Sequence, residues 1–266
     1  MSLIRRNVTR AIYNTTEVTR EIDTPDATTL SFVMTTSDAL YVGFKKPFAS
    51  RYFHFATLNT NSRTLTVQYW DGTTWVAVED VVDQTIGFTA NGFLSWQNPG
   101  GWKPVAQTPI VDVELYWIKI TVSGSLSAGT SLQAVLNLFC DDSLVKAYYP
   151  DLISDDRWLP EGYTNFLLQY VADKDLVVKR LKADGIITDE SMVLDVNEVA
   201  LAAVHAAAHI IMFPIARGED DRQAAADAER KMNQELNKVK FDFDTNNSGA
   251  IETIEQDQGN VFKARG

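Results

Sequence analysis

Residues 114–122 read ELYWIKITV, a run dominated by β-branched and aromatic side chains whose second half alternates apolar with polar residues. Segments of this length and composition are typical of β-strands. Six further runs share the pattern: TLSFVM (29–34), ALYVGF (39–44), RYFHFATL (51–58), TLTVQYW (64–70), TWVAV (74–78) and LQAVLNLF (132–139). Short strands at this spacing predict an antiparallel β-sandwich over residues 28–140.

Turn-forming residues separate these runs. Asp71-Gly72 and Asn91-Gly92 are the dipeptides that favour the positive backbone angles of tight hairpins. They support antiparallel pairing between neighbouring strands.

The sequence changes to helical periodicity from Asp141 onward. Residues 164–184 carry apolar side chains at three- and four-residue spacings, and Gly185 follows as a stop signal. A second helix is predicted after a cap at Asp195, and Pro214 should end it near Met212. A third, highly charged helix is predicted from about residue 220 to 240. The fold class is therefore α+β in two domains, an N-terminal sandwich and a C-terminal small helical bundle.

Charge and tryptophan content support a boundary near residues 138–146. Residues 1–140 hold ten Lys and Arg against eleven Asp and Glu, whereas residues 141–266 hold 14 against 24. Five of the six tryptophans lie in the first part. We expect an N-terminal arm at 1–27, because single apolar residues among Asn and Thr bury little area alone. The sandwich then covers 28–140 and the helical domain 141–266.

The tryptophans also allow a carbohydrate-binding interpretation. Aromatic faces stack on sugar rings, and Asp71 and Asp83 are candidates for holding hydroxyl groups. Packing in the core or at a hairpin end is the simpler explanation for Tyr69, Trp70 and Trp75. Both interpretations stay open at this point.

No catalytic residue is predicted, and we expect the protein not to be an enzyme. Nucleotide-binding glycine motifs and the G-x-S-x-G motif are absent from the sequence. Cys140 is the single cysteine and is expected to be reduced in the core. His205 and His209 have ligand spacing without the glutamate of HExxH, which favours packing. The acidic segment 149–156 is equally compatible with a solvated loop and a hydrolytic carboxylate pair, so a hydrolase remains a further alternative.

Membrane insertion is not expected. No run approaches the roughly 18 to 20 apolar residues of a spanning helix, and no standard signal peptide is recognisable.

Residues 244–255 read DTNNSGAIETIE and match a twelve-residue calcium loop. Such a loop needs oxygen ligands at fixed positions and a glycine at the sharp turn. The candidate ligands are Asp244, Asn246, Ser248, the carbonyl of Ala250, Glu252 and Glu255. Ca²⁺ is the predicted ion. An Asx-rich turn without an ion is the alternative, because no exiting helix and no partner loop are visible.

The charged helix predicted at 220–240 has a narrow apolar stripe. Its members Ala225, Ala228, Met232 and Leu236 are candidates for contacts between subunits. Residues 199–216 are more apolar than a small three-helix unit can cover, which favours a closed, heterologous ring.

Two stretches in the first part of the chain resemble a sandwich module found in virion proteins of tailed bacteriophages. They are YWDGTTWVAVEDVVDQTIGFTANGFLSWQNPGGWKPV (69–105) and YWIKITVSGSLSAGTSLQAVLNLF (116–139). The module is similar in outline to discoidin-like carbohydrate-binding sandwiches. This resemblance implies a virion setting, with a carbohydrate-binding tail or baseplate module as the alternative function.

The second part resembles the head-tail connector, or neck adaptor, proteins of tailed bacteriophages. The resemblance rests on LFCDDSLVKAYYPDL (138–152), LPEGYTNFLLQYVADKDLVVKRLKADGII (159–187) and the helices and turn that follow. It implies a structural protein, made in the host cytoplasm, that forms a homo-oligomeric ring, dodecameric in this family, beneath the portal protein. Neck or tail completion proteins are the other implied partners. DNA would pass through the ring without specific binding, in keeping with the acidic helical part.

Overall fold

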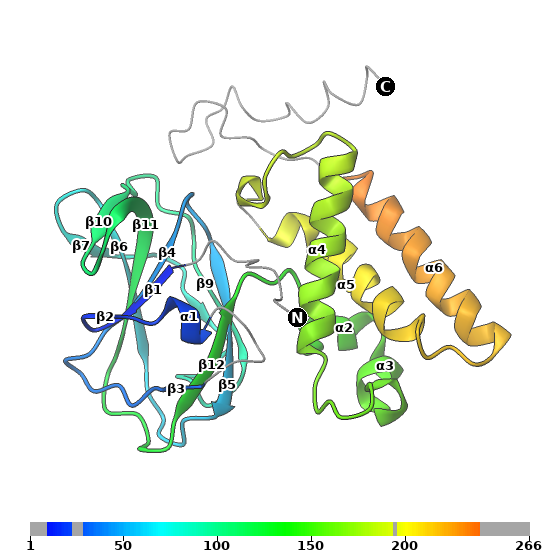
Figure 1. The fold of residues 1–266 in the computed structure, drawn as a ribbon, viewed down its shortest axis with the longest axis horizontal. Coiled ribbons are helices and arrows are strands. Elements are labelled where there is room, and N and C mark those ends of the chain that lie inside the picture. The colour runs from blue at the N-terminus through cyan, green and yellow to red at the C-terminus, as the bar shows by residue number, and fades with distance from the viewer. Residues whose placement is uncertain (1–9, 23–28, 194–195, 240–266) are drawn as a thin grey trace. The chain divides into compact units, whose positions relative to one another are not determined.

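The computed structural model describes residues 10–22, 29–193 and 196–239 (Figure 1). Over these residues the protein is α+β, with antiparallel strands in the N-terminal part and helices in the C-terminal part. The chain divides into two compact units between Asn137 and Leu138. We call residues 10–137 the strand unit and residues 138–239 the helical unit.

The strands of the strand unit form two antiparallel sheets in the described part of the chain. The first sheet has the order β2-β1-β4-β11-β6-β7, with β10 paired to β11, and the second has the order β3-β12-β5-β9-β8. The bounds are β1 Arg10–Tyr13, β2 Thr16–Glu17, β3 Leu30–Ser31, β4 Leu40–Phe44, β5 Ser50–Thr57, β6 Leu65–Trp70, β7 Trp75–Ala77, β8 Val82–Asp83, β9 Gly92–Ser95, β10 Val105–Gln107, β11 Ile110–Val122 and β12 Ser131–Leu136. Each of the seven predicted segments contains a strand, and the Asp71-Gly72 turn joins β6 to β7 as expected.

One hydrophobic core receives side chains from both sheets. Val42 of β4 and Ile118 of β11 come from the first sheet, and Phe53 of β5 and Val135 of β12 come from the second. All four side chains have no exposed area. Because successive side chains of a strand point to opposite faces, the neighbouring residue Trp117 lies on the other face of the first sheet.

The prediction of an N-terminal arm at 1–27 is wrong for residues 10–22. β1 pairs with β4, and the short helix α1 (Thr19–Ile22) follows it. Ala11 and Ile12 have no exposed area, and Val18 and Ile22 are also buried. The segment has little apolar area of its own, but pairing with a distant strand buries all of it. The remaining residues of the predicted arm lie outside the described residues.

The helical unit contains α2 (Asp142–Tyr148), α3 (Pro150–Ser154), α4 (Leu167–Ala183), α5 (Asn197–Met212) and α6 (Glu219–Leu236). α5 packs against α2, α4 and α6 (Figure 1). Ala202, Ala203, Ala206, Ala207 and Ala208 of α5 are buried, and these small side chains allow the close packing of its neighbours.

The three long helices α4, α5 and α6 confirm the helices predicted from the sequence. The acidic segment 149–156 contains helical turns that were not predicted. α5 ends at Met212, shortly before Pro214, while the predicted cap Asp195 lies outside the described residues. The segment 149–156 is helical rather than a loop, because Pro150 begins α3 and Asp155 caps a short 3₁₀ turn. Its three aspartates are solvent-exposed, as the solvated interpretation expected. Leu152 of α3 is buried and anchors the segment.

The predicted subunit interface on α6 is corrected by the structure. Ala225, Ala228, Met232 and Leu236 are at most 3% exposed. The stripe faces inward because α6 packs along α5 of the same chain, where the ring of His209 lies 3.0 Å from the Ala225 carbonyl oxygen. These four side chains are therefore core residues and do not offer a surface to a second subunit.

Trp117 and Gly43 make the closest approach in the first sheet. They are cross-strand partners on β11 and β4, and a Cβ atom at residue 43 would lie 2.6 Å from the Trp117 ring. The indole Nε1–H of Trp117 donates to the Val105 carbonyl at 2.9 Å, which fixes the ring over the glycine. Glycine is required here for space.

We predict that Gly43→Ala destabilises the protein by about 1–3 kcal/mol, because the added methyl group overlaps a ring that cannot move away. Gly129→Ala is the matched control, since a Cβ atom at Gly129 meets nothing within 4 Å. Its effect should stay within about 0.5 kcal/mol. Urea unfolding followed by tryptophan fluorescence measures both. Equal effects of the two substitutions would contradict the steric explanation.

Candidate functional site

Buried polar side chains gather around α4 of the helical unit. Asp173 and Lys174 are consecutive residues in the middle of this helix, and they are 0% and 2% exposed. Asp141, at the start of α2, is also buried. Charged side chains are rarely buried unless they are paired, so each of these groups calls for a partner.

The segment 140–142 is bonded to α4 by two side-chain hydrogen bonds. The Cys140 thiol donates to Asp173 Oδ2 at 3.1 Å, and the Tyr170 hydroxyl donates to Asp142 Oδ1. Tyr170 and Asp173 are three residues apart and therefore share one face of α4. Asp141 has a different role, because its Oδ1 accepts the backbone N–H of Leu144 at 3.0 Å and caps α2.

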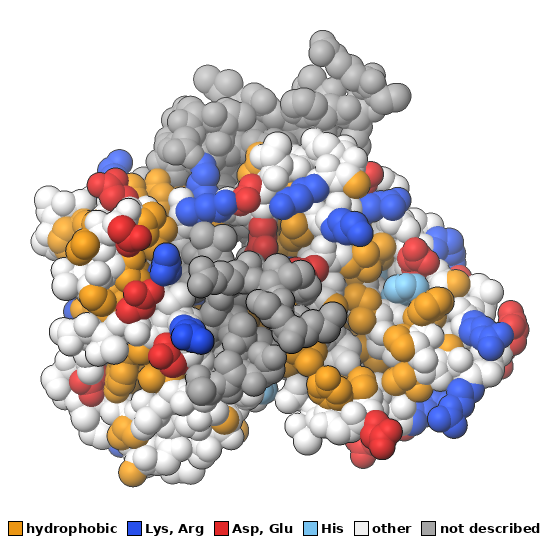
Figure 2. Space-filling view, in the orientation of Figure 1, with side chains coloured by type: hydrophobic (Ala, Val, Ile, Leu, Met, Phe, Trp, Pro, Cys, Tyr) orange, Lys and Arg blue, Asp and Glu red, His pale blue; other side chains and the backbone are white. Residues whose placement is uncertain are grey.

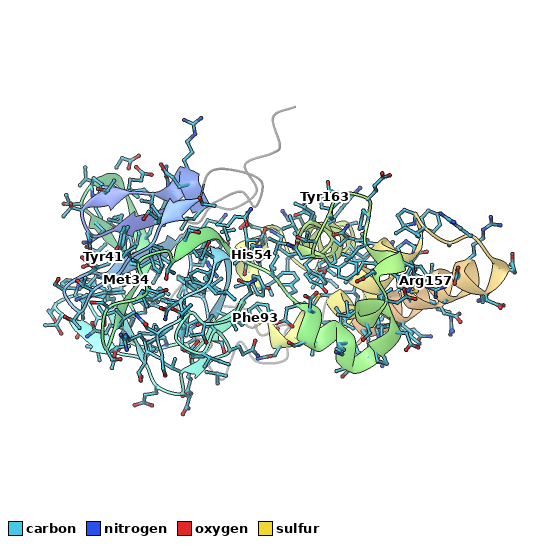
Figure 3. The ribbon with its side chains drawn as sticks, turned by 90° about the horizontal axis from the view of Figure 1, so that it is seen from below. Met34, Tyr41, His54, Phe93, Arg157 and Tyr163 are labelled. Carbon is cyan, nitrogen blue, oxygen red and sulfur yellow. The ribbon has the colours of Figure 1, made fainter. Side chains whose placement is uncertain are left out.

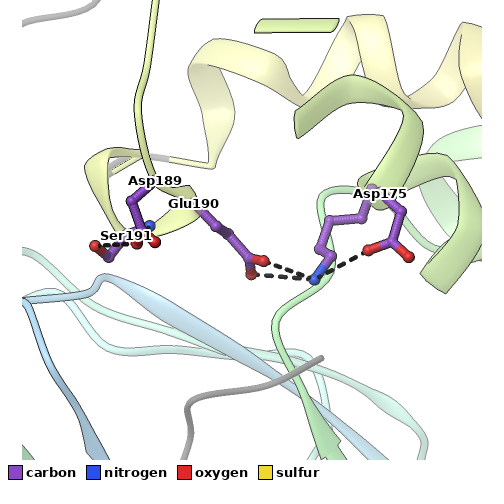
Figure 4. A network of polar contacts seen from close by, with 5 residues as sticks. Asp175, Asp189, Glu190 and Ser191 are labelled. Atoms are coloured by element: carbon purple, nitrogen blue, oxygen red, sulfur yellow. Dashed lines mark hydrogen bonds and ion pairs between the residues drawn. The ribbon is translucent and has the colours of Figure 1, made fainter. Parts of the chain in front are cut away.

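Lys174 is paired with Glu190 and Asp175, both of which are marked in Figure 4. Its Nζ donates to both carboxylate oxygens of Glu190, at 3.1 and 3.0 Å, and lies 3.7 Å from Asp175. Glu190 begins a 3₁₀ turn that Asp189 caps, because the Asp189 carboxylate accepts the backbone N–H of Ser191. The ion pair thus ties the segment after α4 back onto the helix.

Burial sets the protonation of the acid and the thiol. Desolvation raises the pKa of Asp173 well above its usual value, and the hydrogen bond from the Cys140 thiol and the nearby Lys174 charge only partly oppose this shift. Desolvation, together with the hydrogen bond to Asp173, raises the pKa of Cys140 well above its usual value. A thiol needs its thiolate form to act as a nucleophile, so Cys140 is chemically inert at neutral pH. The predicted buried, reduced cysteine is confirmed in its burial.

Metal ligation was predicted for residues 244–255, and all six candidate ligands lie outside the described residues. The Ca²⁺ assignment therefore stays a prediction. Within the residues that the structure describes, no cluster of three or more His, Cys, Asp or Glu side chains has an arrangement that could hold a metal ion.

The two histidines of α5 pack through hydrogen bonds. His205 Nδ1 lies 2.7 Å from the hydroxyl of Tyr149, and His209 bonds to the Ala225 carbonyl of α6. Burial lowers the pKa of His205, and Lys231 on α6 lowers it further. The lowered pKa favours the neutral ring, whose Nδ1 shares a hydrogen bond with the Tyr149 hydroxyl. These contacts agree with the packing interpretation of the H-x-x-x-H spacing.

The aromatic side chains of the strand unit divide into a buried and a half-buried set. Trp96, Trp102 and Trp117 are buried, whereas Trp70 and Trp75 are half-buried at the β6–β7 hairpin. Trp75 contacts both Trp70 and Tyr41, with ring centroids 5.5 and 5.4 Å apart. Tyr41 is marked in Figure 3. The sequence therefore predicted packing correctly for most tryptophans.

The two carboxylates proposed to hold sugar hydroxyls are engaged in turns. Asp71 Oδ1 accepts the backbone N–H groups of Thr73 and Thr74, both at 2.7 Å. Asp83 accepts those of Thr85 and Gly87, at 2.9 and 2.8 Å. These bonds lower the pKa of Asp71 and explain both residues as turn formers.

Several large apolar side chains of the helical unit are exposed. Phe213 is 67% exposed, Tyr148 53%, Tyr163 48% and Leu168 38%. Figure 2 shows hydrophobic side chains gathered on the visible face of the helices, and Tyr163 is marked in Figure 3. Sequence periodicity missed this surface, since Tyr148 and Phe213 lie at the ends of helices rather than in an apolar stripe.

We predict that Tyr149→Phe destabilises the protein by about 1–2 kcal/mol, because the buried His205 Nδ1 loses its partner. Tyr148→Phe is the control, since the Tyr148 ring contacts the same histidine but is half exposed. Its effect should be under about 0.5 kcal/mol. Thermal unfolding at pH 8 measures both.

The same histidine makes stability depend on pH. The folded pKa of His205 lies below its unfolded value of 6.5, so the unfolded chain binds the proton more readily. Protonation of His205 therefore lowers the free energy of unfolding as the pH falls below that value. His205→Gln should reduce this loss of stability.

No family model matches the chain, and no curated protein matches it. None of the described helices has the length and apolar character needed to span a membrane.

Proposed function

We propose that this protein is a structural component of the neck of a tailed bacteriophage. It would form the head-tail connector ring beneath the portal, link capsid to tail and line the path of the DNA. In this proposal the two sheets are a β-sandwich domain of the virion type, and the helices are a connector domain. The protein acts in the virion and has no catalytic role.

The proposal is supported by the acidic composition of residues 141–266 together with the exposed apolar side chains of the helical unit. Residues 141–266 hold 14 Lys and Arg against 24 Asp and Glu, and four large apolar side chains of this part are exposed. An apolar surface favours contact with another protein, while an acidic one repels phosphate. Both properties suit a subunit that packs into a ring around DNA without gripping it.

The expected partners follow from this role. They are further copies of the same chain, twelve in the ring that the resemblance implies, together with the portal protein and neck or tail completion proteins. Subunit contacts are assigned to the exposed side chains Tyr148, Tyr163, Leu168 and Phe213. Ca²⁺ bound by residues 244–255 would be an additional stabilising ligand of the assembled particle.

We predict that the double variant Tyr148→Ser/Phe213→Ser weakens ring assembly at least tenfold in half-maximal concentration, because it removes apolar contacts between subunits. The control variant Val82→Ser/Val111→Ser changes side chains of matched exposure, 55% and 67% against 53% and 67%, in the strand unit. Light scattering after size-exclusion chromatography and electron microscopy, with and without portal, measure assembly.

The control should assemble like the wild type. A wild-type protein that stays monomeric with portal present would overturn the connector proposal. Normal assembly of the double variant would overturn the assignment of the contact surface.

A carbohydrate-binding tail or baseplate module is the second candidate. It is favoured by the half-buried rings of Trp70, Trp75 and Tyr41, which lie together at the β6–β7 hairpin. The buried tryptophans and the engaged carboxylates of Asp71 and Asp83 do not contribute to such a site.

For this candidate, we expect Trp70→Ala to reduce binding to host surface polysaccharide at least tenfold, because a stacking face is lost. Thr66→Ala, an exposed change on the same strand, should bind normally. Glycan binding can be followed by calorimetry. No binding by the wild type to any surface polysaccharide tested would rule this candidate out.

A further inference from the structure

The connection between β12 and α2 is held on α4 by side chains that all carry titratable protons. Cys140 supplies a thiol and Asp142 a carboxyl group, and α4 supplies Tyr170 and Asp173 from one face. The Cys140–Asp173 bond is buried on both sides. Apolar side chains could hold residues 140–142 on α4 equally well. A buried acid, Asp173, at this contact therefore needs a separate explanation.

Asp173 is placed unfavourably for a carboxylate. Its side chain has no exposed area, Oδ2 receives the Cys140 thiol, and Oδ1 has no hydrogen-bond partner. An ionised carboxylate has acceptor capacity on both oxygens, and leaving one buried and unused is costly. A protonated carboxyl group avoids the buried charge.

The surrounding charges do not supply the missing partner. Lys174 points its ammonium group to Glu190 and Asp175, while Asp141 and Asp142 lie on the segment that Cys140 joins to α4. α5 also packs on α4, and its two histidines bond to Tyr149 and to α6. Lys174 favours the ionised form of Asp173 and Asp175 opposes it, but neither donates a hydrogen bond to Oδ1. Ionisation would therefore leave a charged oxygen buried without a hydrogen-bond donor.

We infer that Asp173 is a proton-operated latch, which holds residues 140–142 on α4 while its carboxyl group is neutral and releases them when the proton leaves. The proton passes to solvent, and the segment swings out so that the new carboxylate becomes hydrated. This device is independent of the proposed ring function. It controls the attachment of the chain segment through which the helical unit begins.

The direction of the pH dependence follows from linkage. Burial holds the pKa of folded Asp173 above the unfolded value of 3.8, so the folded chain binds the proton more tightly. The latch is therefore fully closed in acid and opens as the pH rises through the folded pKa. The pH dependence of Asp173 is opposite in sign to that of His205, whose protonation destabilises the fold as the pH falls. The two effects are separated by their pH ranges and by substituting each residue in turn.

Hydrogen exchange and thiol labelling of the full-length protein test the latch. Backbone exchange of residues 140–149 and reaction of Cys140 with a maleimide are measured from pH 5 to pH 9. Each rate is divided by the rate of the unfolded protein at the same pH, which removes the intrinsic pH dependence of amide and thiol chemistry. The quotient is the local opening constant.

Between pH 5 and pH 9 we expect the local opening constant to rise at least tenfold in the wild type. In Asp173→Asn it should change less than twofold over the same range. The asparagine keeps a carbonyl acceptor for Cys140 but has no proton to lose. Tyr170→Phe is the matched variant, because it removes the other bond to the same segment. It should raise the opening constant by the same factor at every pH.

A flat wild-type opening constant between pH 5 and pH 9 would overturn the inference without any variant. A pH dependence that persists unchanged in Asp173→Asn would also overturn it, because another group would then be responsible. If Asp173→Asn does not fold, Asp173→Ser serves in its place. Global unfolding is measured in parallel with urea. An opening constant equal to the global unfolding constant at every pH would overturn the inference, because residues 140–149 would then not open locally.

Discussion

The contact of Trp117 with Gly43 constrains most of the first sheet. Because the ring occupies the space where a Cβ atom would stand, β4 and β11 must pair in one register, with Gly43 opposite Trp117. A shift by one residue would place a side chain under the ring and turn the inward residues outward. Val42 and Ile118 then face the common core, and β1 and β6 add to the two free edges of this pair.

Strand alternation and helix periodicity were enough to predict a strand in each of seven segments and the three long helices. The elements that were missed are short, and the burial of some depends on partners far along the chain. β1 contains only four residues, and its burial depends on β4, some thirty residues later. α3 has five residues and is set by Pro150 and the burial of Leu152. A local pattern carries no information about such distant partners.

The candidate site shows the same limit in its side chains. The packing role of His205 and His209 was predictable, because an alanine-rich apolar helix leaves few other options. The burial of Asp173 was not, since helix 164–184 reads as amphipathic and its acids would be assigned to the solvent face. The stripe from Ala225 to Leu236 was recognised as a contact surface, but sequence periodicity cannot distinguish the same chain from a second one as the partner.

Asp173 and Lys174 are consecutive buried residues of α4, but only Lys174 has an oppositely charged partner at hydrogen-bonding distance among the described residues. This difference distinguishes the roles of the two side chains. Lys174 has Glu190 at hydrogen-bonding distance, so its ammonium group is stabilised in place although it is buried. Asp173 has only a thiol, which is a weak donor, and an oxygen without a partner. Replacing a poorly satisfied buried polar group by an apolar one is often neutral or stabilising, so stability alone does not account for the acid. A group that is tolerable in one protonation state and costly in the other makes the attachment of residues 140–142 responsive to pH, which an apolar contact at the same place would not do.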